Sequence, residues 1–253
     1  MKYLIGNSGL VGKTLLKTIS FDATFNSSNI HTFETVFAER GDVILTCLPA
    51  TKWLVNQNKL KDLQNIYNII NILSKCKFQN ITLISTIDVY LDSPLEVDES
   101  YEPTIKTLHY GTNRFLFEKM VKDILHYETL HIFRLPALFG EFIKKNIIFD
   151  LLHNNNIKDI NINTYYQWYN LNRLNADIEL FTKSYKNGIF NLFPEPIYTA
   201  DIIDSFFANS KVGYKGAAVK YDWRTQYNSS GYIQTAQQVM NDLQKFINET
   251  RNK

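Results

Sequence analysis

Two patterns of hydrophobic and polar positions alternate along the first 140 residues. Short apolar runs predict five strands, at 2–5, 22–25, 42–50, 80–86 and 130–136. Apolar residues at helical spacing predict three helices between them, at 10–19, 57–76 and 111–126. Strands that alternate with helices indicate an α/β fold with a doubly wound parallel sheet.

The rhythm changes after Gly140. The segment 141–175 is rich in Asn and aromatic residues, with weak strand signals, and helical spacing returns near 176–186, 199–209 and 232–250. We therefore expect residues 1–140 to form a Rossmann-like domain. Residues 141–253 are expected to form mainly a small C-terminal α+β cap, with segments that return to the first domain. Such a cap would lie over the carboxyl ends of the strands, where sheets of this kind bind ligands.

Composition excludes several classes of partner. The chain carries 27 Lys and Arg against 25 Asp and Glu, so no strong field recruits nucleic acid or an anionic membrane. The start of the chain has a strand pattern rather than that of a signal peptide, and the apolar stretch near 65–73 is too short to cross a bilayer. Cys47 and Cys76 lie in apolar runs without metal-type spacing, which predicts buried free thiols, no metal site and a cytoplasmic location.

The opening stretch LIGNSGLVGKT (4–14) is compatible at first sight with two kinds of nucleotide loop. A triphosphatase loop that ends in Gly12-Lys13-Thr14 requires a glycine at position 7, and that residue is Asn7. Glycines at 6, 9 and 12 after a strand instead favour a dinucleotide-binding turn. The cofactor-binding residues expected there are Gly6, Ser8, Gly9, Leu10, Val11 and Gly12.

The end of the second predicted strand bears on the type of dinucleotide. An acidic residue often holds the ribose 2′-hydroxyl of NAD at this point, but the stretch FNSSN (25–29) has none. The side chains of Asn26, Ser27 and Ser28 could bind a 2′-phosphate, although no arginine is adjacent. These residues favour NADP as the cofactor, with NAD as the alternative.

Two further stretches are more specific. LISTIDVY (83–90) ends a predicted strand, and HYGTNRFLFEKM (109–120) places Tyr110 24 residues after Thr86 and ahead of Glu118. RLPALFG (134–140) follows the next strand. Together they resemble the extended short-chain dehydrogenase/reductase family, which includes nucleotide-sugar epimerases, dehydratases and ketoreductases.

The resemblance implies roles for individual residues. Tyr110 would carry the proton at the substrate oxygen, and Thr86 would hydrogen-bond that oxygen. The family has a lysine four residues after the tyrosine, which lowers the pKa of the phenol and holds the nicotinamide ribose. Here that position is Arg114, which keeps a positive charge but cannot give up a proton.

The segment CLPATKW (47–53) follows the third predicted strand, where the family's loop passes the cofactor. The resemblance implies cofactor contacts at Leu48, Pro49 and Ala50, while Lys52 could meet a phosphate or this could be an ordinary turn. After the fifth strand, Leu135 and Pro136 are expected to line the cofactor as well.

Candidates for substrate binding are fewer. Asp88 could contact substrate or simply serve its loop, and Asn146 and Gln167 in the cap are expected to receive the sugar nucleotide, together with Arg173. The aromatic segment 165–169 could stack on a base or form the core of the cap. The family's dehydratases have two acids directly after the threonine, and Ile87 in the first of these positions counts against 4,6-dehydration.

These inferences predict an NAD(P)-dependent oxidoreductase or epimerase that acts on a nucleotide-linked sugar. Reduction of a 4-keto sugar is the leading reaction, with Tyr110 as proton donor. One alternative is a catalytically weak or inactive NAD(P)-binding regulatory protein of the same fold, and another is a reductase of a non-sugar carbonyl. Family members often dimerise, which makes a homodimer through helices 57–76 and 110–126 an expectation.

Overall fold

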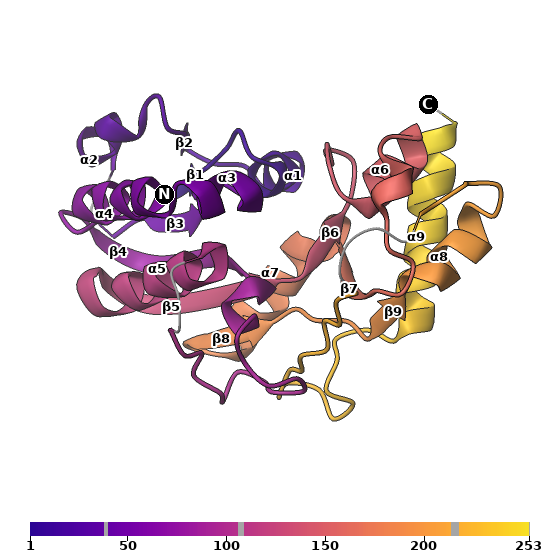
Figure 1. Ribbon diagram of the computed structural model, residues 1–253. Coiled ribbons are helices and arrows are strands. Elements are labelled where there is room, and N and C mark those ends of the chain that lie inside the picture. Colours follow the sequence, from indigo (N-terminus) through magenta and orange to yellow (C-terminus); the bar gives the residue numbers. More distant parts are fainter. Residues whose placement is uncertain (38–39, 106–108, 214–217, 253) are drawn as a thin grey trace. The chain divides into compact units, whose positions relative to one another are not determined.

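The computed structural model describes residues 1–37, 40–105, 109–213 and 218–252. The chain divides into two compact units, neither of which is continuous in sequence. Unit 1 comprises Met1–Pro94, Tyr101–Arg134 and Leu174–Phe190, and unit 2 comprises Leu95–Ser100, Leu135–Arg173 and Asn191–Lys253. Figure 1 labels the elements of both units.

Unit 1 is built on a six-stranded sheet with the strand order β2-β1-β3-β4-β5-β8 (Figure 1). The strands are β1 (Lys2–Ile5), β2 (Ala23–Phe25), β3 (Asp42–Leu45), β4 (Lys77–Thr86), β5 (His126–Leu135) and β8 (Gly188–Asn191). Strand β1 pairs in parallel with β2 and β3, and β3 pairs in parallel with β4. The predicted Rossmann-like α/β sheet is therefore confirmed.

Helices flank this sheet in two pairs. Helices α4 and α5 pack against each other, and α1 packs against α7. The α-helices of unit 1 are α1 (Leu10–Thr18), α2 (Phe33–Val36), α3 (Lys52–Gln57), α4 (Lys59–Leu73), α5 (Tyr110–Ile124) and α7 (Leu174–Ser184). The short 3-10 helices are η1 (Ile30–Thr32) and η2 (Ile87–Tyr90).

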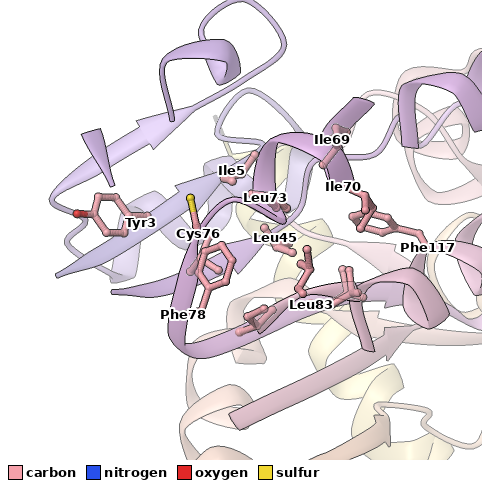
Figure 2. Close-up of a cluster of buried hydrophobic side chains, with 14 of the residues drawn as sticks. Tyr3, Ile5, Leu45, Ile69, Ile70, Leu73, Cys76, Phe78, Leu83 and Phe117 are labelled. Carbon is pink, nitrogen blue, oxygen red and sulfur yellow. The ribbon is translucent and has the colours of Figure 1, made fainter. Parts of the chain in front are cut away.

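The core of unit 1 lies between the sheet and the pair α4 and α5. Three apolar residues at helical spacing on α4, Ile66, Ile70 and Leu73, are at most 4% exposed. They share one cluster with Leu45 from β3 and Phe117 from α5; most of this cluster is drawn in Figure 2. Burial of such side chains contributes roughly 1.5–3 kcal/mol each, so this face fixes where α5 lies on the sheet.

Two elements differ from the sequence prediction. The strand expected at 42–50 ends at Leu45, and the chain then turns so that the Thr46 hydroxyl donates to the carbonyl oxygens of Ile5 and Gly6 at 3.1 Å. The helix expected at 57–76 is preceded by a separate helix, and Asn58 lies between the two with a non-helical backbone (φ −125°, ψ 51°). Neither break has a Gly or Pro signal at the site of the break.

Unit 2 contains a three-stranded sheet with the order β6-β7-β9, with β6–β7 parallel and β7–β9 antiparallel. Its strands are β6 (Ala137–Phe139), β7 (Tyr165–Asn170) and β9 (Pro196–Tyr198). Its helices are α6 (Ile147–His153), η3 (Ile157–Asp159), η4 (Leu171–Arg173), α8 (Thr199–Phe206) and α9 (Ala236–Arg251). Helix α9 packs on β7 and begins with a capping box between Thr235 and Gln238.

The segment Leu95–Ser100 belongs to unit 2 although the chain on both sides of it belongs to unit 1. Glu99 accepts hydrogen bonds from the backbone of Asn191 and Gln226 and from the Thr225 hydroxyl, at 2.6–2.9 Å. Removal from water raises the pKa of Glu99, and these three donors oppose that rise. One carboxylate therefore fastens the loop to unit 2.

A buried ion pair joins α5 to the sheet in unit 1. Arg134 on β5 donates to both carboxylate oxygens of Glu118 on α5, at 2.6–3.2 Å, and the two side chains are 1% and 3% exposed. Ser85 on β4 also donates to Glu118, and Arg134 donates to the Tyr90 hydroxyl of η2. The pair thus connects α5, β4, β5 and η2.

We expect Glu118→Ala to lower the free energy of unfolding by about 3–5 kcal/mol, because it leaves the Arg134 guanidinium buried without its partner. The double variant Glu118→Leu with Arg134→Met removes both charges and should recover most of that loss. Urea unfolding of both variants measures the difference. Equal losses in the single and double variants would contradict a role for the pair.

Candidate active site

The glycine turn after β1 is closely packed at two of its three glycines. Gly6 has φ +104°, and a Cβ there would lie 2.4 Å from the carbonyl oxygen of Thr46. A Cβ at Gly12 would lie 2.1 Å from the carbonyl oxygen of Gly6. At Gly9, the nearest atom would be 3.6 Å away, which is ordinary contact. Two glycines are therefore required by the fold, and Gly9 is not.

The space at Gly9 fits a ligand. Gly9 is exposed and is the N-cap residue of α1. Because glycine has no side chain, it cannot cap the first N–H groups of the helix, and the first turn of α1 has no acidic residue. Open N–H groups at a helix N-terminus suit a phosphate group. Ser8 is also exposed, whereas Leu10 and Val11 are half-buried. The backbone here fits a dinucleotide pyrophosphate.

The residues expected at the ribose of the cofactor form hydrogen bonds within their own turn. The Asn26 side chain accepts from the backbone and hydroxyl of Ser28 at 2.8 and 2.7 Å, and donates to Asn7 at 3.2 Å. Ser27 and Ser28 are exposed. This turn holds no acidic side chain, so nothing in it repels a 2′-phosphate.

The loop after β3 links the glycine turn to α5. At its start, the Thr46 hydroxyl donates to Gly6, and three residues later the Pro49 carbonyl oxygen accepts from Arg114 at 2.6 Å. Leu48 is half-buried, and Pro49 and Ala50 are exposed. The loop expected to contact the cofactor therefore connects the glycine turn directly to α5, which carries Tyr110 and Arg114.

Tyr110 begins α5, and Gly111 explains how closely that helix approaches η2. A Cβ at Gly111 would lie 1.9 Å from the carbonyl oxygen of Asp88, so only glycine allows this contact. The Tyr110 backbone N–H donates to Asn56 at 2.9 Å, and His109 caps the helix by accepting from Thr112 at 3.3 Å. The Tyr-Gly pair thus sets the phenol beside the end of β4.

Arg114 lies one turn along α5, 4.4 Å from the centroid of the Tyr110 ring. Its guanidinium is buried and forms a bidentate pair with Asp62 of α4 at 2.7 and 3.2 Å, besides its bond to Pro49. Three of its five N–H groups therefore already have acceptors in the protein. The arginine is anchored between α4 and the β3 loop.

Asp62 was not singled out from the sequence, although it is central to this arrangement. It is buried, and Asn113 also donates to its carboxylate at 2.8 Å. In sequence, it is one acid within an amphipathic helix, where a carboxylate usually faces solvent. The only signal was the unusual arginine itself, since a buried guanidinium requires an acidic partner.

Thr86, Asp88 and Lys52 form a second group, and Lys52 brings it close to the Tyr110 ring. The Thr86 hydroxyl donates to the Asp88 carboxylate at 3.1 Å. Lys52 forms an ion pair with that carboxylate at 2.7 Å, and its Nζ lies 5.9 Å from the centroid of the Tyr110 ring. The four sequence-predicted residues Thr86, Asp88, Tyr110 and Arg114 therefore come together in unit 1, with Lys52 among them.

These charges have opposing effects on the phenol. Removal from water raises the pKa of Tyr110. The charges of Arg114 and Lys52 lower this pKa, whereas the charge of Asp88 raises it, and the net result is a pKa above the usual value of 10. The expected depression of this pKa by Arg114 is thus present but outweighed. The side chain is therefore a neutral phenol near pH 7 and can donate a proton.

The substrate candidates in unit 2 have bonds within that unit. Gln167 is 1% exposed; its amide donates to the carbonyl oxygens of Pro194 and Trp223 and accepts from the Trp223 N–H. Asn146 caps α6 and donates to Leu138 at 2.8 Å. Arg173 ends η4 and is half-buried. Their role in substrate binding stays a prediction.

The remaining candidates are placed as follows. Leu135 ends β5 and Pro136 follows it, both buried. Trp168 and Tyr169 of the aromatic segment are buried as well. Cys47 and Cys76 are free thiols; Cys76 is buried as predicted, whereas Cys47 is only half-buried, and removal from water raises the pKa of Cys47 to about 12. Within the described ranges, His, Cys, Asp and Glu side chains form no group of three that could hold a metal ion.

Within the same described residues, no helix has the length and apolar character needed to cross a membrane.

The chain is similar in fold to several solved enzyme structures. A dTDP-4-dehydrorhamnose reductase from Bacillus anthracis, in complex with NADP, has a TM-score of 0.70 and 15% identity, with 98% of each chain covered. WbmG from Bordetella bronchiseptica, with NAD and UDP, has a TM-score of 0.74 and 12% identity, covering 98% of this chain and 94% of that one. UDP-glucose 4-epimerase from Thermotoga maritima, with UDP-glucose, has a TM-score of 0.65 and 11% identity, covering 100% and 99%.

No protein-family model and no curated protein sequence matches the chain. At identities of 11–15%, the structural likeness establishes the fold alone, which this chain shares with these enzyme structures.

The glycine geometry separates a requirement of the fold from one of ligand binding. We expect Gly12→Ala to lower the free energy of unfolding by roughly 1–3 kcal/mol through its clash with Gly6. Gly9→Ala has room for its methyl group and should cost less than about 1 kcal/mol. Urea unfolding of the matched variants tests this. A larger loss in Gly9→Ala than in Gly12→Ala would contradict it.

Proposed function

We propose that the chain is an NAD(P)-dependent oxidoreductase of the extended short-chain dehydrogenase/reductase type that acts on a nucleotide-linked sugar. The observation that carries this is the continuous connection from Gly6 through Thr46 and Pro49 to Arg114, which lies against the Tyr110 ring. It joins a turn that fits a pyrophosphate to a phenol that can move a proton. The UDP-glucose, NADP and NAD bound in structures of similar fold support this substrate class and cofactor.

The reaction favoured is reduction of a 4-keto group. The cofactor supplies hydride at its nicotinamide when bound. Tyr110 gives its proton to the substrate oxygen. The Thr86 hydroxyl donates to Asp88 in this structure, so it orients the same oxygen only by exchanging that hydrogen bond for one to the substrate. Since the pKa of Tyr110 lies above its usual value, the phenol is protonated at neutral pH. A donor is what reduction requires, whereas oxidation begins with a phenolate that accepts a proton.

Two features bear on the alternatives within this class. Asp88 is the only acid directly after Thr86, and Lys52 and the Thr86 hydroxyl already engage its carboxylate, which argues against 4,6-dehydration. The turn Asn26–Ser28 holds no acid, which favours NADP over NAD.

We expect Tyr110→Phe to abolish oxidation of NADPH by dTDP-4-dehydrorhamnose and by a UDP-linked 4-keto sugar, because no hydroxyl remains to donate the proton. Cofactor binding should persist, seen as an unchanged rise in Tm on addition of NADPH. Tyr101→Phe serves as a control elsewhere in unit 1. Undiminished turnover in Tyr110→Phe would sink the assignment, and no rise in Tm for the wild type with NADPH or NADH would sink the cofactor class.

A second candidate is an NAD(P)-binding regulatory protein without turnover. The observation that favours it is the bidentate bond of Arg114 to Asp62, which neutralises the charge that replaces the family's lysine.

Arg114→Lys distinguishes the two candidates. A lysine cannot bridge both Asp62 oxygens and the Pro49 carbonyl, so we expect a loss of turnover together with a lower Tm. Arg40→Lys, at an exposed position, is the matched control. Higher turnover in Arg114→Lys would indicate a degraded enzyme, and absence of turnover in both variant and wild type would favour the regulatory protein.

A further inference from the structure

Lys52 occupies an unusual place for a lysine beside the candidate proton donor. It is the first residue of α3, directly after the loop that links the glycine turn to α5. Its Nζ pairs with both Asp88 oxygens at 2.7 and 2.8 Å and lies 5.9 Å from the centroid of the Tyr110 ring. Its side chain is 53% exposed, while that of Asp88 is 4% exposed.

The chemistry of a tyrosine donor requires a second proton source. Once Tyr110 has given its proton, a phenolate remains, and a proton must return before the next turnover. Arg114 cannot supply it, because a guanidinium does not lose its proton in proteins and this one is bonded to Asp62 and Pro49. The Thr86 hydroxyl already donates to Asp88.

The charges of three groups act on the pKa of the Tyr110 phenol: Arg114 on α5, Asp88 on η2 and Lys52 on α3. Of these three, Lys52 alone is a cation that can lose a proton, and its partly exposed side chain can regain one from water. The buried Asp88 carboxylate holds the ammonium in place by charge and hydrogen bonding.

We propose that Lys52 is the proton-relay residue for Tyr110 and that Asp88 is its positioning residue, so that this pair takes over the proton supply that Arg114 cannot provide. In this step, an N–H bond of the Lys52 ammonium breaks and the O–H bond of Tyr110 forms. The neutral amine then takes a proton from solvent. The relay rests on the proposed reductase function, but the effect of Lys52 on Tyr110 can be measured without cofactor or substrate.

The first experiment reads the phenol directly. Protein labelled with 3-fluorotyrosine is titrated by ¹⁹F NMR, and the Tyr110 signal is assigned by its loss in Tyr110→Phe. In Lys52→Met, the signal should titrate roughly one unit higher, because a nearby cation is lost and Asp88 is left uncompensated. Lys52→Arg should titrate as the wild type does, and Lys61→Met, an exposed lysine on α4, is the matched control. An unchanged titration in Lys52→Met overturns the proposal.

The second experiment separates proton transfer from charge. With whichever of the two 4-keto sugar nucleotides the wild type reduces faster, Lys52→Arg should lower kcat on the order of tenfold or more and leave KM for NADPH nearly unchanged. Lys52→Ala should lose as much and regain activity with added ethylamine, but not with guanidinium. Asp88→Asn should lower kcat in the same direction.

Two kinetic outcomes overturn the relay. Full kcat in Lys52→Arg means that only the charge is needed. A raised KM for NADPH with unchanged kcat means that Lys52 binds a cofactor phosphate. Failure of the proposed function looks different, since the wild type would then neither bind NADPH nor reduce either sugar, while the ¹⁹F titration still reports whether Lys52 acts on Tyr110.

Discussion

The buried ion pair between Glu118 and Arg134 is the interaction on which the arrangement of unit 1 depends. It ties α5 to β5, while Ser85 and Tyr90 extend it to the end of β4 and the turn that follows. Those elements carry Thr86, Asp88 and Tyr110. Loss of one partner from such a buried pair is costly, so the pair adds a directional constraint on the position of α5 to the apolar packing of that helix on the sheet.

The second buried pair, Arg114 with Asp62, lies beside the Tyr110 ring. Arg114 stands at the position where the family that the sequence resembles has a lysine. A lysine at this position would combine a mobile charge with an exchangeable proton. The arginine keeps the charge, but Asp62 and the Pro49 carbonyl fix its orientation. It thereby forms a rigid link between α4 and the loop after β3.

The sequence predicted five of the six strands of the sheet, because these contain short apolar runs, and the longer helices, because their apolar residues recur at helical spacing; strand β8 (Gly188–Asn191) was not predicted. The division of the helix expected at 57–76 was less predictable, because the break at Asn58 depends on a backbone conformation that no Gly or Pro marks. The spacing of Thr86, Tyr110 and Arg114 predicted that these residues gather in one place, and their catalytic roles stay predictions. Asp62 and the position of Lys52 could not be predicted, because their partners lie 52 and 36 residues away in sequence and meet only through packing.

The chain passes between the two units five times, at residues 94, 100, 134, 173 and 190. A cut near residue 140 would therefore not release an intact sheet, since β8 and α7 of unit 1 come from 174–190. Each unit closes only after part of the other has been synthesised. Because of this interleaving, a chain that stops within 95–189 lacks part of both units.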